Sequence, residues 1–393
     1  MPICTPRLNI QSASRAGAFQ VLLSGFLLLA STSPSTAGTF TQAASLAQAR
    51  SEFSLTLLPS GEVIATGGIE GGGSIDAVFL ASVERYDPEL NSWIEASPMT
   101  TARGEHAVTM LLSQQILVVG GATDKYVPVG SAEKYDPIAD TWTPAGTLAT
   151  ARTQTTATLL SSGKVLVAGG YHARVLASAE LYDPATDEWT PAGALAQARY
   201  LHTATLLPSG KVLVAGGMEI PSFDGISSVE IYDPDTNEWS PAASLAHARY
   251  KATATVLANG QLLIAGGNDG NEVLASAEIY DEATDTWTEA GALNEARYLH
   301  TATLLPSGEV LVVGGAPGNF PVASAELYDP QADAWSITGS LATARYLHGA
   351  SILESGEVLI AGGVDPPDDL VSAEIYRPDG EDAIFADGFE FGL

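Results

Sequence analysis

The sequence predicts an all-β fold, a seven-bladed β-propeller closed by an N-terminal strand. Three observations predict it: a Gly-Gly pair recurs seven times, an Arg lies 17 residues before each pair, and a Glu-x-Tyr follows each pair. Six units also have a Trp nine residues after the Glu. Short strands at even spacing, with glycine and aromatic residues once per unit, are typical of propeller blades. The Gly-Gly pairs begin at Gly67, Gly120, Gly169, Gly216, Gly266, Gly314 and Gly362.

Each unit reads as four short strands, which we name a to d. In the fourth unit, residues 200–207 form strand a, and the Ser209-Gly210 pair supplies the positive φ of a tight hairpin turn. Strand b spans 212–215 and strand c spans 229–232. A polar Asp-Pro loop then leads to strand d at Trp239.

The two ends of the repeat predict how the ring closes. The seventh unit has Glu374 and Tyr376 but no following Trp. At the other end, Phe40 lies ten residues before Arg50, which is the spacing of Trp to Arg elsewhere. We therefore expect the strand around Phe40 to complete the last blade and to leave no open sheet edge.

A Gly-Gly pair followed by a spaced Tyr and Trp resembles the Kelch repeat, whose period is about 50 residues. The resemblance covers roughly residues 39–378, and it implies the propeller fold without specifying a function. Kelch-type propellers resemble the catalytic domain of galactose oxidase, whose copper radical site requires a Cys crosslinked to a Tyr. Cys4 is the only cysteine of the chain, and we expect it to be lost with the N-terminal segment. That chemistry is therefore not expected here.

Residues 1–37 have the layout of a cleaved secretory signal peptide. Basic residues precede an apolar run over 16–30, and small residues lead to a predicted cut after Ala37. The run is too short to span a bilayer, so we expect no membrane span after cleavage and a secreted or periplasmic protein. Removing Arg7 and Arg15 lowers the formal charge from −29 to −31. We expect the propeller over residues 38–378 and a short acidic and aromatic tail over 379–393.

The composition excludes several function classes. There are 17 Lys and Arg against 46 Asp and Glu, so the chain lacks the positive charge that nucleic acids attract. A single Cys excludes every multi-cysteine metal site. We expect a monomer with no metal and no cofactor, and we find no sequence motif of a catalytic site.

The repeat arginines admit two interpretations. In the first, seven guanidinium groups at one level form a belt at the channel mouth that holds a carboxylate or sulfate. In the second, each pairs with the repeat Glu of its own blade, and the strict repetition favours this pairing. The candidates for ligand contact are Arg103, Arg199, Arg249, Arg297 and Arg345.

Two positions beside each Arg add further candidates. Histidines three residues after the Arg are either metal or acid–base groups or, as is more common for a repeated position, packing and hydrogen-bonding groups. Tyrosines one residue after the Arg are either stacking groups for a ligand or parts of the blade packing. These residues are His106, His202, His300, His348, Tyr200, Tyr250, Tyr298 and Tyr346.

All length variation lies between the Gly-Gly pair and the Glu, in the b–c loop, where 9 to 15 residues intervene. Because the b–c and d–a loops emerge on one face of an antiparallel blade, we predict that this face binds a protein or a glycan. The alternatives are a sugar epimerase or mutarotase that needs no cysteine, and a structural surface protein whose acidity serves solubility.

Overall fold

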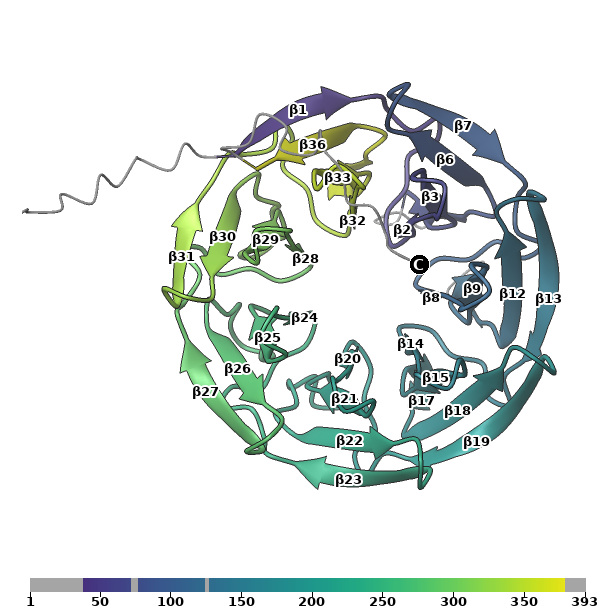
Figure 1. The fold of residues 1–393 in the computed structure, drawn as a ribbon, viewed down its shortest axis with the longest axis vertical. Coiled ribbons are helices and arrows are strands. Elements are labelled where there is room, and N and C mark those ends of the chain that lie inside the picture. Colours follow the sequence, from purple (N-terminus) through teal and green to yellow (C-terminus); the bar gives the residue numbers. More distant parts are fainter. Residues whose placement is uncertain (1–37, 72–76, 124–126, 379–393) are drawn as a thin grey trace, which may run out of the picture. The chain divides into compact units, whose positions relative to one another are not determined.

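Seven four-stranded antiparallel sheets are arranged in a ring in the computed structural model (Figure 1), and residues from all seven blades line a cavity in the central channel. The structure describes residues 38–71, 77–123 and 127–378. The segment 1–37 that the sequence predicts to be a signal peptide, the tail 379–393 and parts of the first two b–c loops lie outside the described residues. The described residues confirm the predicted all-β, seven-bladed propeller.

In each blade the strands run outward from the channel in the order a, b, c, d. The innermost a strands are β2 (Ser54–Leu57), β8 (Ala107–Met110), β14 (Thr156–Leu159), β20 (Thr203–Leu206), β24 (Thr253–Val256), β28 (Thr301–Leu304) and β32 (Gly349–Ile352). The b strands are β3 (Val63–Thr66), β9 (Ile116–Val119), β15 (Val165–Ala168), β21 (Val212–Ala215), β25 (Leu262–Ala265), β29 (Val310–Val313) and β33 (Val358–Ala361).

The outer half of each blade consists of strands c and d. The c strands are β6 (Val83–Asp87), β12 (Ser131–Asp136), β18 (Ser178–Asp183), β22 (Val229–Asp233), β26 (Ala277–Asp281), β30 (Ala325–Asp329) and β36 (Ala373–Arg377). The d strands are β7 (Ser92–Ala96), β13 (Thr141–Thr147), β19 (Glu188–Ala194), β23 (Glu238–Ala242), β27 (Thr286–Ala290), β31 (Ala334–Ile337) and β1 (Thr39–Ala43).

Four b–c loops add short hairpins of their own. These pair β4 (Ile69–Glu70) with β5 (Val78–Phe79), β10 (Ala122–Thr123) with β11 (Val127–Pro128), β16 (Tyr171–His172) with β17 (Arg174–Val175), and β34 (Val364–Asp365) with β35 (Asp368–Asp369).

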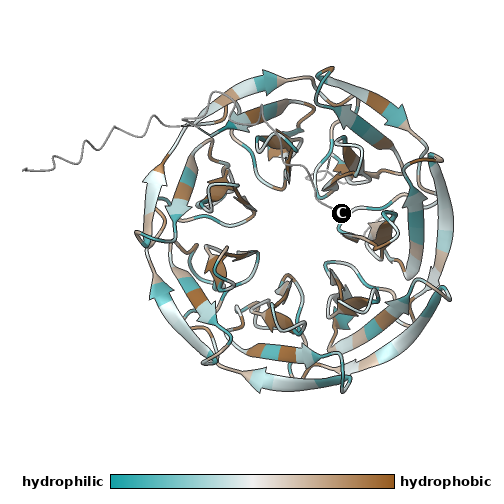
Figure 2. Ribbon diagram, in the orientation of Figure 1, coloured by the Kyte–Doolittle hydropathy of each residue, from teal (hydrophilic) through white to brown (hydrophobic). Residues whose placement is uncertain are grey.

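The hydrophobic core lies between neighbouring blades. Every b strand is buried along its whole length because another blade covers each of its faces, which explains runs such as Val-Leu-Val-Ala. In β21, Val212 and Val214 pack toward blade 3, whereas Leu213 and Ala215 pack toward blade 5. Figure 2 shows hydrophobic residues concentrated on these inner strands.

In each blade an aromatic pair packs the outer strand d against strand c. Within blade 4, the rings of Tyr232 and Trp239 lie 5.2 Å apart, and the Tyr232 hydroxyl donates to Asn237 Oδ1 at 2.8 Å. The Trp239 indole N–H donates across the blade boundary to the carbonyl of Ala192, also at 2.8 Å. The repeated Trp therefore links adjacent blades as well as packing within its own blade.

The closing strand confirms the prediction made from Phe40. Strand β1 pairs antiparallel with β36, and Phe40 lies opposite Tyr376 in the register that Trp239 takes opposite Tyr232. The Phe40 and Tyr376 rings are 5.0 Å apart. Just before β1, a Cβ on Gly38 would lie 2.1 Å from the Tyr376 hydroxyl, so the closing strand approaches the ring too closely for any residue with a side chain.

Among the described residues, no helix is long and apolar enough to cross a membrane.

Candidate functional site

A buried guanidinium group holds each blade together. In blade 5, Arg249 Nη1 donates to the carbonyls of Gly266 at 2.7 Å and Ser276 at 3.0 Å. Its Nη2 donates to Ser276 Oγ at 3.1 Å and to Glu278 Oε1 at 2.7 Å. The other blades repeat this arrangement with ion-pair distances of 2.6 to 3.1 Å. The pairs are Arg50–Glu84, Arg103–Glu133, Arg152–Glu180, Arg199–Glu230, Arg249–Glu278, Arg297–Glu326 and Arg345–Glu374.

The same carboxylate also fixes the d–a loop. Glu278 accepts hydrogen bonds from the backbone amides of Ala246 at 2.7 Å and His247 at 3.2 Å. Burial lowers the pKa of the Arg249 guanidinium, and the adjacent Glu278 carboxylate opposes that shift. One ion pair therefore ties the Gly-Gly end of strand b, the start of strand c and the d–a loop together.

The structure corrects the interpretation of the repeat arginines as a ligand-binding belt. Their exposed fractions are 0 to 1%, because each guanidinium lies inside its blade against the repeat Glu and Ser. The one-pair-per-blade interpretation describes the observed contacts. The buried side chains include all five arginines that were candidates for ligand contact: Arg103, Arg199, Arg249, Arg297 and Arg345.

The predicted histidines link neighbouring blades. Their Nε2 atoms lie within hydrogen-bond distance of a threonine hydroxyl in the preceding blade, at 2.9 to 3.4 Å. Burial, and to a lesser degree a nearby repeat arginine, lowers the pKa of each imidazole to about 3, so all four are neutral at neutral pH. The pairs are Thr66–His106, Thr156–His202, Thr253–His300 and Thr301–His348.

This geometry fits the packing and hydrogen-bonding interpretation of the histidines. The described residues contain no group of three or more His, Cys, Asp or Glu side chains arranged to hold a metal ion.

The predicted tyrosines lie at the base of the b–c loops. The backbone of each forms a bridge to the residue that follows the Gly-Gly pair of its own blade. Tyr200 is buried and its ring lies 5.7 Å from that of Tyr171, whereas the other three are half-buried. The d–a and b–c loops therefore meet on one face of the propeller. The bridges are Tyr200 to Met218, Tyr250 to Asn268, Tyr298 to Ala316 and Tyr346 to Val364.

A ring of backbone hydrogen bonds surrounds the channel at the residue two positions after each Arg. Six of the seven links around the ring are present, each from an amide N–H to the carbonyl of the equivalent residue in the preceding blade, at 3.0 to 3.3 Å. All seven residues have positive φ, between 51° and 59°. We call them the channel ring: Glu52, Glu105, Gln154, Leu201, Lys251, Leu299 and Leu347.

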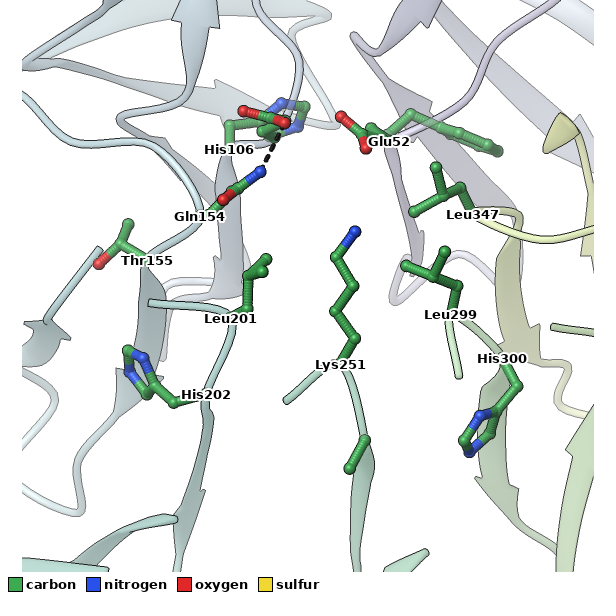
Figure 3. A pocket seen from close by; sticks show the side chains of 13 residues that line it. Glu52, His106, Gln154, Thr155, Leu201, His202, Lys251, Leu299, His300 and Leu347 are labelled. Atoms are coloured by element: carbon green, nitrogen blue, oxygen red, sulfur yellow. Dashed lines mark hydrogen bonds between the residues drawn. The ribbon is translucent and has the colours of Figure 1, made fainter. Parts of the chain in front are cut away.

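The channel-ring side chains line a cavity of about 340 Å³ together with several of the predicted histidines (Figure 3). Blades 1 to 3 contribute two carboxyl groups and an amide, and blades 4 to 7 contribute three leucines and a lysine. Two donors hold Glu105, since Thr153 Oγ1 and Gln154 Nε2 each lie 2.7 Å from one of its carboxylate oxygens.

Burial and a neighbouring carboxylate strongly perturb Glu52 in this cavity. Burial, and then the adjacent carboxylate of Glu105, raise the pKa of Glu52 to about 8, while the Lys251 ammonium opposes the shift. At neutral pH the Glu52 carboxyl is therefore mostly protonated beside a second carboxyl group. Figure 3 shows the Lys251 side chain extending toward Glu52 across the cavity.

The channel ring was not predicted from the sequence, although the positions on either side of it were candidates for ligand contact. The sequence signal that could have identified it is the contrast between this variable position and its repeated neighbours. The position holds Glu, Gln, Leu or Lys, between a strictly repeated Arg and a partly repeated His. A variable polar position inside a fixed frame is typical of a surface whose chemistry differs from blade to blade. The Ser two residues before every repeat Glu, which binds the guanidinium in each blade, was not predicted either.

Comparison with known proteins agrees with this architecture. Residues 154–363 match the family model described as the KLHDC2/KLHL20/DRC7 Kelch-repeats domain, and residues 60–100 match the Kelch motif. The first match covers more than half of the chain, so the chain belongs to the Kelch-repeat family. No curated protein sequence matches it.

A solved structure has the same fold. It is described as a novel fungal alcohol oxidase with catalytic diversity among the AA5 family, in complex with copper. The TM-score is 0.73 at 16% sequence identity, over 87% of this chain and 77% of the oxidase chain. At this identity the likeness shows the fold alone.

Replacing Arg249 by Met tests the structural role of the buried Arg249–Glu278 ion pair. We expect the free energy of unfolding to fall by about 3–5 kcal/mol, because the Glu278 carboxylate stays buried without its guanidinium. Lys211→Met is the matched control, since the Lys211–Asp233 pair lies at the surface, and it should change stability little. Denaturant unfolding measures both, and equal losses in the two variants would contradict the structural role of the buried pair.

Replacing His300 by Ala tests how the buried histidines affect the pH dependence of the free energy of unfolding. Their folded-state pKa lies below the unfolded value, so the stability they contribute is present above about pH 6.5 and is lost as the pH falls toward 3. Between pH 7 and 4.5 the wild type should lose roughly 2 kcal/mol more than His300→Ala. Ala252 already occupies this position in blade 5. A pH slope in His300→Ala equal to that of the wild type would refute the assignment.

Proposed function

We propose that this Kelch propeller is an exported binding protein whose b–c and d–a loops form a docking face for a protein partner. The observation that supports the face is the distribution of exposed hydrophobic side chains. Among the described residues, eleven large hydrophobic side chains are exposed, and six of them lie in b–c loops. These six are Val78, Val127, Ile220, Phe223, Phe320 and Val371.

Two of these side chains are phenylalanines, in the loops of blades 4 and 6, with exposed fractions of 56% for Phe223 and 75% for Phe320. Aromatic residues are enriched in the buried centre of protein interfaces. The opposite face, formed by the a–b and c–d loops, exposes aliphatic residues but no phenylalanine among the described residues; these are Leu90, Leu112 and Ile138.

The charge of the b–c loops supports a basic partner. The described parts of these loops contain eight acidic residues and one arginine, Arg174. Complementary charge increases the association rate and selects among partners. The acidic residues are Glu70, Glu219, Asp224, Asp269, Glu272, Asp365, Asp368 and Asp369.

Export is the part of the proposal that rests on the sequence. The predicted cut after Ala37 leaves Gly38 directly before the closing strand, at a position where only glycine fits against Tyr376. Mass spectrometry of the protein recovered from outside the cytoplasm should find Gly38 as the first residue. Retention of residues 1–37 on that protein would argue against cleavage.

The double substitution Phe223→Ser/Phe320→Ser tests the docking face. A partner captured from the extracellular or periplasmic fraction and identified should bind the variant at least about tenfold more weakly, because interface aromatics commonly contribute more than 1 kcal/mol each.

Leu90→Ser/Ile138→Ser on the opposite face is the matched control and should bind like the wild type. Unchanged melting temperatures show that both variants fold. Loss of binding in the control but not in the phenylalanine variant would place the docking face on the other side. A glycan array probed with the same proteins reports a carbohydrate ligand as the alternative outcome.

A further inference from the structure

We propose that the channel ring is a binding site for a basic side chain, a guanidinium or primary ammonium on an aliphatic stem, which the partner inserts into the cavity. This inference rests on the proposed docking face and names the group that the partner must present. The acid pair Glu52 and Glu105 accepts the cation, and the leucines of blades 6 and 7 pack against its stem.

The position of the channel ring supports insertion from the docking face. Each channel-ring residue follows directly after the residue that bridges to the b–c loop, and strand a begins two residues later. The ring therefore lies at the end of the channel that opens among the b–c loops. A side chain that projects from a protein docked on those loops reaches the ring first.

The shape and rigidity of the cavity fit a single long side chain. Its volume of about 340 Å³ is too small for a folded segment but large enough for one extended side chain. Because amide hydrogen bonds form six of the seven links between channel-ring backbones, the main chain that carries the lining side chains is held in place before a ligand arrives. Preorganised groups lose little conformational entropy on binding.

The arrangement of polar and apolar groups selects the chemistry of the ligand. Glu105 is already oriented by Thr153 and Gln154, and Glu52 lies beside it. Leu299 and Leu347 line the same cavity from blades 6 and 7 (Figure 3). A carboxylate or sulfate would face two carboxyl groups and one ammonium, whereas a guanidinium with an aliphatic stem matches both walls.

Protonation gives the site a distinctive signature. The charged groups that act on Glu52 are Glu105, Lys251 and Asp369, and the rest of the cavity lining is uncharged, with leucines and neutral histidines among its side chains. The pKa of Glu52 is about 8 in the protein without a ligand. A bound cation stabilises the Glu52 carboxylate, so binding at neutral pH releases a proton from this carboxyl group. Affinity for the cation should therefore rise as the pH increases from 6 to 9.

Lys251 distinguishes a cation site from an anion site. Its ammonium repels a bound cation and would attract a bound anion, so removing it has opposite effects in the two cases. Leucine occupies the equivalent position in three other blades, which makes Lys251→Leu compatible with the fold. Glutamine occupies the equivalent position in blade 3, at Gln154, so glutamine in place of Glu52 and Glu105 is also compatible with the fold.

Isothermal titration calorimetry with n-butylguanidinium tests the site, and pentanoate serves as an anionic probe of similar length. We expect the wild type to bind butylguanidinium with proton release, measured by comparing buffers of different ionisation enthalpy. Glu52→Gln/Glu105→Gln should weaken binding at least about tenfold, and Lys251→Leu should strengthen it several-fold. Glu238→Gln/Glu289→Gln makes the same two replacements at exposed outer-strand sites and should bind like the wild type.

Three results would overturn the inference: no binding of butylguanidinium to the wild type, unchanged affinity in Glu52→Gln/Glu105→Gln, or tighter binding of pentanoate. The identified partner separates this inference from the docking face. If the phenylalanine variant loses the partner while the double glutamine variant keeps it, the docking face stands and the channel inference fails. If the channel binds the probe while the phenylalanine variant keeps the partner, the channel site stands and the docking face fails.

Discussion

The rest of the structure depends on one interaction, the buried ion pair between the repeat Arg and the repeat Glu. In every blade it joins the end of strand b to the start of strand c and to the loop that enters from the neighbouring blade. A buried ion pair contributes little net stability compared with well-packed hydrophobic residues, but it tolerates few geometries. Its seven copies therefore set the position of the chain where strand a begins.

The ion pair fixes the backbone of the neighbouring residues, and the side chains at these positions vary from blade to blade. The residue two positions after each Arg has the same backbone conformation in all seven blades, yet its side chain is acidic, amide, aliphatic or basic. The b–c loops likewise begin at a fixed Gly-Gly pair and differ in length and sequence. Both variable sets meet on one face, so the propeller presents an asymmetric surface on a nearly symmetric frame.

The repeat predicted most of the frame, because strand periodicity, turn glycines and aromatic markers are local signals. Phe40 predicted the closing strand since one Trp was missing from the series. The channel ring was not predictable in the same way, because its positive φ values are sustained by hydrogen bonds to other blades rather than by glycine. The arginines were ambiguous for a related reason: sequence spacing gives the repeat position but not the direction in which a side chain points.

The repeat arginines are buried and closed to ligands, whereas we infer that the channel ring is open to a basic side chain. A crystal structure of the protein soaked with n-butylguanidinium tests it most directly. We expect a guanidinium within hydrogen-bond distance of the Glu52 and Glu105 carboxylates, with its stem against Leu299 and Leu347 and the seven Arg–Glu pairs unchanged. An empty channel, or a guanidinium bound on the opposite face, would contradict it.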